Sequence, residues 1–108
     1  MTQDSEGRQD RKVLVRVDPD LADLIPSFLE NRRKDIAALL AALDQSDYET
    51  VRILGHSMKG AGGGYGFDGI TEIGAVLEQA AKEHNSEAIR KWVGELSAYL
   101  DRVEVVYD

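Results

Sequence analysis

Apolar residues recur at helical spacing in the first half of the chain. Between residues 21 and 43 they fall three, four and seven positions apart, which predicts one face of an amphipathic helix. Because Pro26 is tolerated only near a helix start, we expect a short helix before it and a long helix from Pro26 to Leu43. The predicted stripe comprises Leu21, Leu24, Ile25, Phe28, Leu29, Ile36, Leu39, Leu40 and Leu43.

Polar capping residues predict the starts of three more helices. Ser46 and Glu49 have the spacing of a capping box, in which each side chain satisfies a backbone N–H at the helix start. The expected helices begin at Asp47 or Tyr48, at Gly69 after a cap at Asp68, and at Glu87 after Asn85–Ser86. The last two carry apolar stripes made of Ile70, Ile73, Val76, Leu77, Ala80 and Ala81, and of Ile89, Trp92, Val93, Leu96, Leu100 and Val103.

Helices joined by such short connections must pack against their neighbours. The pattern therefore predicts an all-α fold, an antiparallel four-helix bundle with a short N-terminal helix. Residues 1–12 have almost no apolar side chain and are expected to form a loose, flexible tail, which leaves residues 13–108 as one helical bundle domain. The β-branched segments 13–17 and 103–107 could pair as strands, and the sequence does not decide whether they do.

Composition narrows the classes of function. The chain has 108 residues and a net charge of -7, which allow one domain and argue against nucleic acid as a partner. Zero cysteines exclude disulfides and thiolate nucleophiles, and two histidines are too few for a His-rich metal cage, so we expect no metal site. Because the sequence has no apolar run that could span a membrane and its N-terminus is polar, we expect a cytoplasmic protein. A monomer is the simplest expectation, and a small binding or carrier module is the default class of function.

One histidine lies on the polar side of the second long helix. On a wheel of about 100° per residue, His56 falls about 180° from the apolar arc. Its neighbours on the same face are Arg52, Lys59, Gly60 and Gly63. The apolar arc comprises Val51, Leu54, Met58, Ala61 and Tyr65.

Four glycines follow this histidine within a few residues. Each glycine inside a helix costs about 0.8 to 1 kcal/mol relative to alanine, so a helix that ends at Lys59 is the plain interpretation. Ala61 and Tyr65 nevertheless continue the apolar stripe in phase, which favours a continuous helix. In a continuous helix, a backbone without Cβ atoms would let a second macromolecule approach the imidazole. The glycines are Gly60, Gly62, Gly63 and Gly64.

Phosphoryl transfer is the chemistry that best suits an exposed histidine beside cations. A neutral imidazole nitrogen can attack phosphorus, and Lys59 can neutralise the oxygens of the resulting phosphoimidazole. Acid–base catalysis would need a substrate pocket and an orienting carboxylate on the same face, and the sequence indicates neither. For a histidine on an arbitrary helix, a solvated side chain with no task is the commoner outcome.

The residues around His56 resemble the signature of histidine-phosphotransfer (HPt) domains. The likeness rests on His56-Ser57-Met58-Lys59-Gly60-Ala61 with Gly63, Tyr65 and Gly66, followed by Ile70, Ile73, Leu77-Glu78 and Ala80-Ala81. It extends over about residues 18 to 105. The resemblance implies a four-helix bundle whose His56 accepts a phosphoryl group from a receiver-domain aspartate or donates one to it. It also implies that Lys59 assists the phosphoryl group, while Gly60 and Gly63 clear space for the partner.

The same resemblance sets expectations for partners and cofactors. The partners would be receiver domains of response regulators or of hybrid histidine kinases, in a multistep two-component phosphorelay. The Mg²⁺ needed for transfer would come from the receiver, so the chain would hold no cofactor of its own. It would also not be an enzyme, since it has no Walker-type loop and no nucleotide site.

Residues near His56 are candidates for docking the partner. Arg52, Gly60 and Gly63 share its face, and Ile53 is an apolar position about 60° away. Arg32 and Arg33 on the preceding helix either line the approach or are simply solvated. The other histidine of the chain, residue 84, is expected in the last turn of its helix, where the macrodipole favours a cation, without a role in the chemistry.

Two other functions stay open at this point. A helical adaptor of the anti-sigma type would use the same surface without being phosphorylated, although docking alone does not need Lys59. The phosphoacceptor domain of a chemotaxis-type kinase would take its phosphoryl group from a separate ATP-using domain. Replacement of His56 by Gln separates the adaptor from the phosphocarrier.

Overall fold

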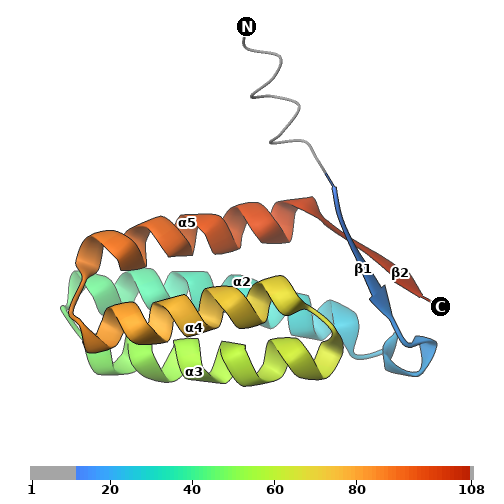
Figure 1. The fold of residues 1–108 in the computed structure, drawn as a ribbon, viewed down its shortest axis with the longest axis horizontal. Coiled ribbons are helices and arrows are strands. Elements are labelled where there is room, and N and C mark those ends of the chain that lie inside the picture. The colour runs from blue at the N-terminus through green and yellow to red at the C-terminus, as the bar shows by residue number, and fades with distance from the viewer. Residues whose placement is uncertain (1–11, 108) are drawn as a thin grey trace, which may run out of the picture.

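The computed structural model describes residues 12–107, which form four long helices and two short strands. In chain order the elements are β1 (Val13–Val17), the 3₁₀ turn η1 (Pro19–Leu21), α2 (Ile25–Asp44), α3 (Tyr48–Tyr65), α4 (Asp68–Lys82), α5 (Ser86–Arg102) and β2 (Val103–Tyr107). Successive helices run in opposite directions, and α2 and α4 each pack against both α3 and α5 (Figure 1). The predicted antiparallel four-helix bundle is confirmed. The expected short helix before Pro26 is a single 3₁₀ turn.

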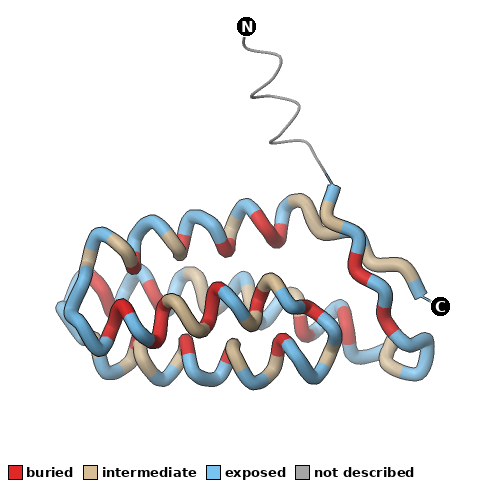
Figure 2. The backbone as a smooth tube through the Cα atoms, viewed as in Figure 1, coloured by how far each residue is buried: buried red, intermediate tan, exposed pale blue. Residues whose placement is uncertain are grey.

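The core lies among the four helices, where each contributes its apolar stripe (Figure 2). Two residues of the predicted first stripe, Leu24 and Leu40, are exposed instead. Leu24 lies just before α2 begins. Leu39 points into the core, so Leu40, the next residue along the helix, points toward solvent. Trp92 is partly buried at the edge of the core. The largest fully buried side chains are those of Phe67, Ile25, Leu39, Met58, Ile70, Leu77, Ile89, Leu96 and Val51.

The start of α3 differs from the predicted capping box. Asp47, not Ser46, is the N-cap, and its Oδ1 accepts the backbone N–H of Thr50 at 3.1 Å. Ser46 instead belongs to the end of α2, where its left-handed φ of 54° turns the chain so that the Asp47 N–H donates to the Ala42 carbonyl at 2.8 Å. Glu49 pairs with Arg52 instead of returning to the cap.

The starts and ends of α4 and α5 also shift. Asp68 lies in the first turn of α4, with Phe67 as the N-cap, and Asn85 caps α5 with Ser86 already helical. His84 is not in the last turn of α4, because the helix ends at Lys82 and the chain reverses through a left-handed φ of 53° at His84. Its ring stacks on the Tyr48 ring with centroids 4.4 Å apart.

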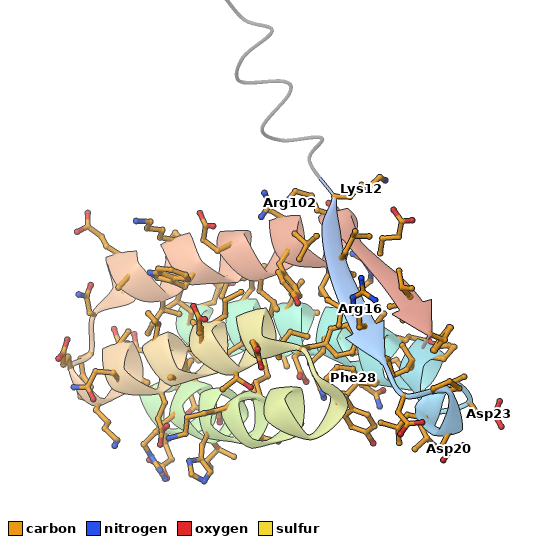
Figure 3. All side chains as sticks on the ribbon, turned by 45° about the vertical axis from the view of Figure 1, so that its right-hand side comes forward. Lys12, Arg16, Asp20, Asp23, Phe28 and Arg102 are labelled. Carbon is orange, nitrogen blue, oxygen red and sulfur yellow. The ribbon has the colours of Figure 1, made fainter. Side chains whose placement is uncertain are left out.

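The two ends of the described chain pair as parallel strands. β1 and β2 run in register from Val13 opposite Val103 to Val17 opposite Tyr107, so Val103 begins a strand and does not extend the last helix as predicted. The pair lies at the end of the bundle where Phe28, labelled in Figure 3, contacts Phe67. The predicted tail, residues 1–12, lies outside the described residues except for Lys12.

Candidate functional site

Helix α3 carries the candidate site and continues through the glycine run. It extends to Tyr65 and ends at Gly66, whose φ of 88° is the left-handed conformation that glycine adopts without a Cβ clash. The prediction from the in-phase apolar stripe is therefore confirmed, and His56 and Lys59 lie one turn apart on a regular helix.

His56 is largely exposed yet has a fixed partner. Its side chain is 65% exposed, as the helical wheel predicts, and its Nδ1 lies 3.1 Å from Oε2 of Glu78 on α4. The sequence indicated no carboxylate that would orient the imidazole, and the structure provides one. Glu78 is 22 positions further along the chain, so the pattern within one helix could not reveal it.

Glu78 is buried although it is charged, and among residues 12–107 no other charged residue is buried. It lies on the otherwise apolar inner stripe of α4. Lys59 approaches its Oε1 with Nζ at 2.9 Å, and Lys82 approaches its Oε2 with Nζ at 3.9 Å. The hydrogen bond from Lys59, and after it the one from His56, hold the pKa of Glu78 below its ordinary value of 4.5 in spite of burial. The carboxylate is therefore ionised at neutral pH.

An ionised carboxylate fixes the roles of the two ring nitrogens of His56. A carboxylate can only accept hydrogen bonds, so Nδ1 carries the proton that it donates to Glu78. In the neutral ring, the proton on Nδ1 leaves Nε2 with a free lone pair. The site thus presents an oriented nitrogen nucleophile on a largely exposed side chain.

Close packing of α3 on α4 brings Glu78 to the histidine. A Cβ atom on Gly55 would lie 2.7 Å from the Glu78 backbone nitrogen, and one on Gly74 would lie 2.6 Å from the backbone nitrogen of Lys59. Each of these two glycines therefore lets one helix backbone approach the other. A third, Gly62, faces Thr71 of α4 in the same way, at 2.6 Å from its Oγ1.

The glycine run divides into positions that face inward and outward. Gly62 serves packing within the chain, so the prediction that the whole run clears space for a partner is wrong for this residue. A Cβ on Gly60 or Gly64 would meet no atom within 4 Å, and one on Gly63 would make an ordinary contact of 3.7 Å. Internal packing gives no reason for glycine at these three positions.

The candidate docking residues differ in how freely they are presented. Ile53 is exposed on α3, whereas Arg52 is held by Glu49 through hydrogen bonds of 3.1 and 2.5 Å. The guanidinium of Arg32 hydrogen-bonds Asp35 and lies over the Phe28 ring.

Arg33 connects α2 to the end of α5, where it donates to the Leu100 carbonyl at 3.1 Å and approaches Asp101. It therefore serves a contact between helices and not the approach to His56.

Residues 12–107 contain no group of three His, Cys, Asp or Glu side chains placed to hold a metal ion. No helix within this range is long and apolar enough to cross a membrane.

Comparison with known proteins places the chain in a family. Searches of curated proteins and of solved structures gave no match. The family model described as "Hpt domain" matches residues 23–105, which include all four helices completely, together with His56, Lys59, Glu78 and Lys82. The chain therefore belongs to the Hpt domain family.

Proposed function

We propose that the chain is a histidine phosphocarrier of a two-component phosphorelay, in which His56 accepts a phosphoryl group from a receiver-domain aspartate and passes it to another. The observation that carries this proposal is the contact between Nδ1 of the exposed His56 and the ionised Glu78. Membership of the Hpt domain family supports the same reaction class. The carrier needs no nucleotide site of its own, because its donor is an already phosphorylated protein.

The transfer follows from the geometry of the ring. The lone pair on Nε2 attacks phosphorus and forms the N–P bond while the P–O bond to the donor aspartate breaks, and that aspartate leaves as a carboxylate. Nδ1 keeps its proton, so the phosphorylated ring becomes cationic. Glu78, at 3.1 Å from Nδ1, stabilises this positive charge, and the reverse sequence returns the group to a second receiver.

Lys59 lies one turn after His56 on α3. Its Nζ contacts Glu78 in the resting site, and the side chain is 42% exposed. When the phosphoryl group arrives, its oxygens compete with Glu78 for this ammonium. Lys59 therefore helps to neutralise the transferred group.

Docking of the receiver uses the open part of α3. Gly60 and Gly63 leave space beside the histidine, and Ile53 offers an exposed apolar side chain. The receiver supplies the Mg²⁺ for the transfer step. A partner of this kind is expected in the cytoplasm. That the chain is a cytoplasmic monomer stays a prediction.

Transfer from a phosphorylated receiver tests the proposal. A panel of receivers carrying labelled phosphate is mixed with the wild-type chain and with the His56→Gln and His84→Gln variants. We expect the wild type and His84→Gln to become labelled to the same extent. His56→Gln should carry no label. Label that persists on His56→Gln would overturn the assignment, and normal signalling by His56→Gln would favour the unphosphorylated adaptor.

A further inference from the structure

A second lysine, Lys82, reaches the same carboxylate as His56. Its Nζ lies 3.9 Å from Oε2 of Glu78, the oxygen that Nδ1 of His56 contacts at 3.1 Å. Lys82 and the imidazole thus converge on one atom from different helices. Lys59 occupies the other oxygen, Oε1.

Lys82 is the less tightly held of the two lysines. The Lys59 ammonium is 2.9 Å from the carboxylate, a hydrogen-bond distance, whereas 3.9 Å for Lys82 is an ion pair without one. The Lys82 side chain is 53% exposed and lines a surface cavity of about 350 Å³ between the start of α3 and the end of α4. It therefore has room to change its partner.

Charge balance favours two lysines over one in the phosphorylated site. The transferred group carries close to two negative charges, Glu78 carries one, and the phosphorylated ring carries one positive charge. With Lys59 alone the site keeps an excess negative charge. Lys82 brings the site to neutrality.

We propose that Lys82 is a second phosphoryl-binding residue, which leaves Glu78 and contacts the phosphoryl oxygens on His56. This inference rests on the proposed function. In the phosphorylated state, Glu78 retains the ring through Nδ1, and both lysines are released toward the dianion. The receiver's aspartyl phosphate would meet cations from α3 and from α4.

The chain offers a closely matched control lysine. Lys34 pairs with Glu30 on α2 at the same four-residue spacing and at 4.0 Å, and both side chains are about 70% exposed. Replacement of either lysine by Gln removes one positive charge and one long ion pair. The two variants differ in whether the paired carboxylate also contacts a histidine.

Phosphorylation by the small donor phosphoramidate tests the inference without a partner protein. Wild type, Lys82→Gln, Lys82→Arg and Lys34→Gln are phosphorylated, and the rate is followed by intact mass. The ³¹P shift of the phosphohistidine is then titrated with pH. We expect Lys82→Gln to slow phosphorylation about fivefold, the effect of about 1 kcal/mol.

We also expect the titration midpoint of the phosphoryl group to rise in Lys82→Gln, because a nearby cation favours the dianion. Lys82→Arg restores both values, and Lys34→Gln matches the wild type. A midpoint in Lys82→Gln equal to that of the wild type would overturn the contact even if the rate fell. A wild-type chain that is not phosphorylated would overturn the proposed function as well, so the two failures are distinguishable.

Discussion

Two glycines of the same run should respond to alanine in opposite ways. Gly60 and Gly62 are both inside α3, so alanine at either position lowers the conformational freedom of the unfolded chain and favours the helix by about 0.8 to 1 kcal/mol. The difference lies in what the added Cβ meets. At Gly60 it meets no atom within 4 Å, and at Gly62 it meets α4.

The cost at Gly62 follows from three close contacts, two of which involve backbone atoms that no side-chain rotation can move away. The Cβ would lie 2.6 Å from Oγ1 of Thr71, 2.7 Å from its backbone nitrogen and 2.9 Å from the Phe67 carbonyl oxygen. Overpacking of this kind costs about 1 to 3 kcal/mol, more than the helix gain in most of that range. We expect Gly62→Ala to be less stable than the wild type by about 1 kcal/mol and Gly60→Ala to be more stable by a similar amount.

Urea denaturation followed by far-UV circular dichroism measures both effects. The two midpoints should move in opposite directions while the slopes stay equal. If both variants gain stability, or both lose it, the division of the glycines into inward and outward positions is wrong.

Gly60→Ala also separates folding from docking. The more stable variant should accept phosphate from a receiver more slowly than the wild type, because the new Cβ stands where the partner approaches. Its reaction with phosphoramidate should be unchanged. Equal rates with the receiver would remove Gly60 from the docking surface.

Three further predictions concern stability. The pKa of Glu78 is lowered from 4.5, chiefly by Lys59, so its charged form stabilises the folded chain above about pH 4.5, and this stability is lost as the pH falls further. Glu78→Gln should therefore lose less stability in acid than the wild type, as measured by urea midpoints at a series of pH values. Burial, and after it the charges of Asp68 and Glu72, raise the pKa of Tyr99 above 10.0, so stability falls as the pH rises beyond about 10. Tyr99→Phe should remove that loss of stability at alkaline pH. A variant that loses as much stability above pH 10 as the wild type would contradict the assignment. Ser46→Gly should raise the midpoint of thermal unfolding, because the left-handed φ of 54° costs a residue with a Cβ about 1 kcal/mol. A lower midpoint would show that backbone strain at Ser46 is not the dominant effect.

Helical periodicity predicted the bundle and the exposed face of His56, because both depend on residues three and four apart. The continuous path of α3 through four glycines was also predictable, since Ala61 and Tyr65 keep the apolar phase. A single-helix pattern contains no information about which residue of another helix lies opposite.

The rest depended on contacts between helices that are distant in the sequence. Glu78 becomes a partner of His56 because Gly55 and Gly74 let α3 and α4 pack closely, and no spacing within α3 indicates this. One signal was present: a carboxylate on the apolar stripe of a helix needs a partner when it is buried. The pairing of β1 with β2 likewise joins the two ends of the described chain, so only the structure could establish it.

The most direct measurement is NMR of the ring nitrogens in the phosphorylated protein with ¹⁵N-labelled histidine. The sequence has two histidines, so His84 serves as an internal reference. The account predicts phosphorus bonded to Nε2 of His56, a proton retained on Nδ1, and an unmodified His84. Phosphorus on Nδ1 of His56, on His84, or on neither residue would contradict it.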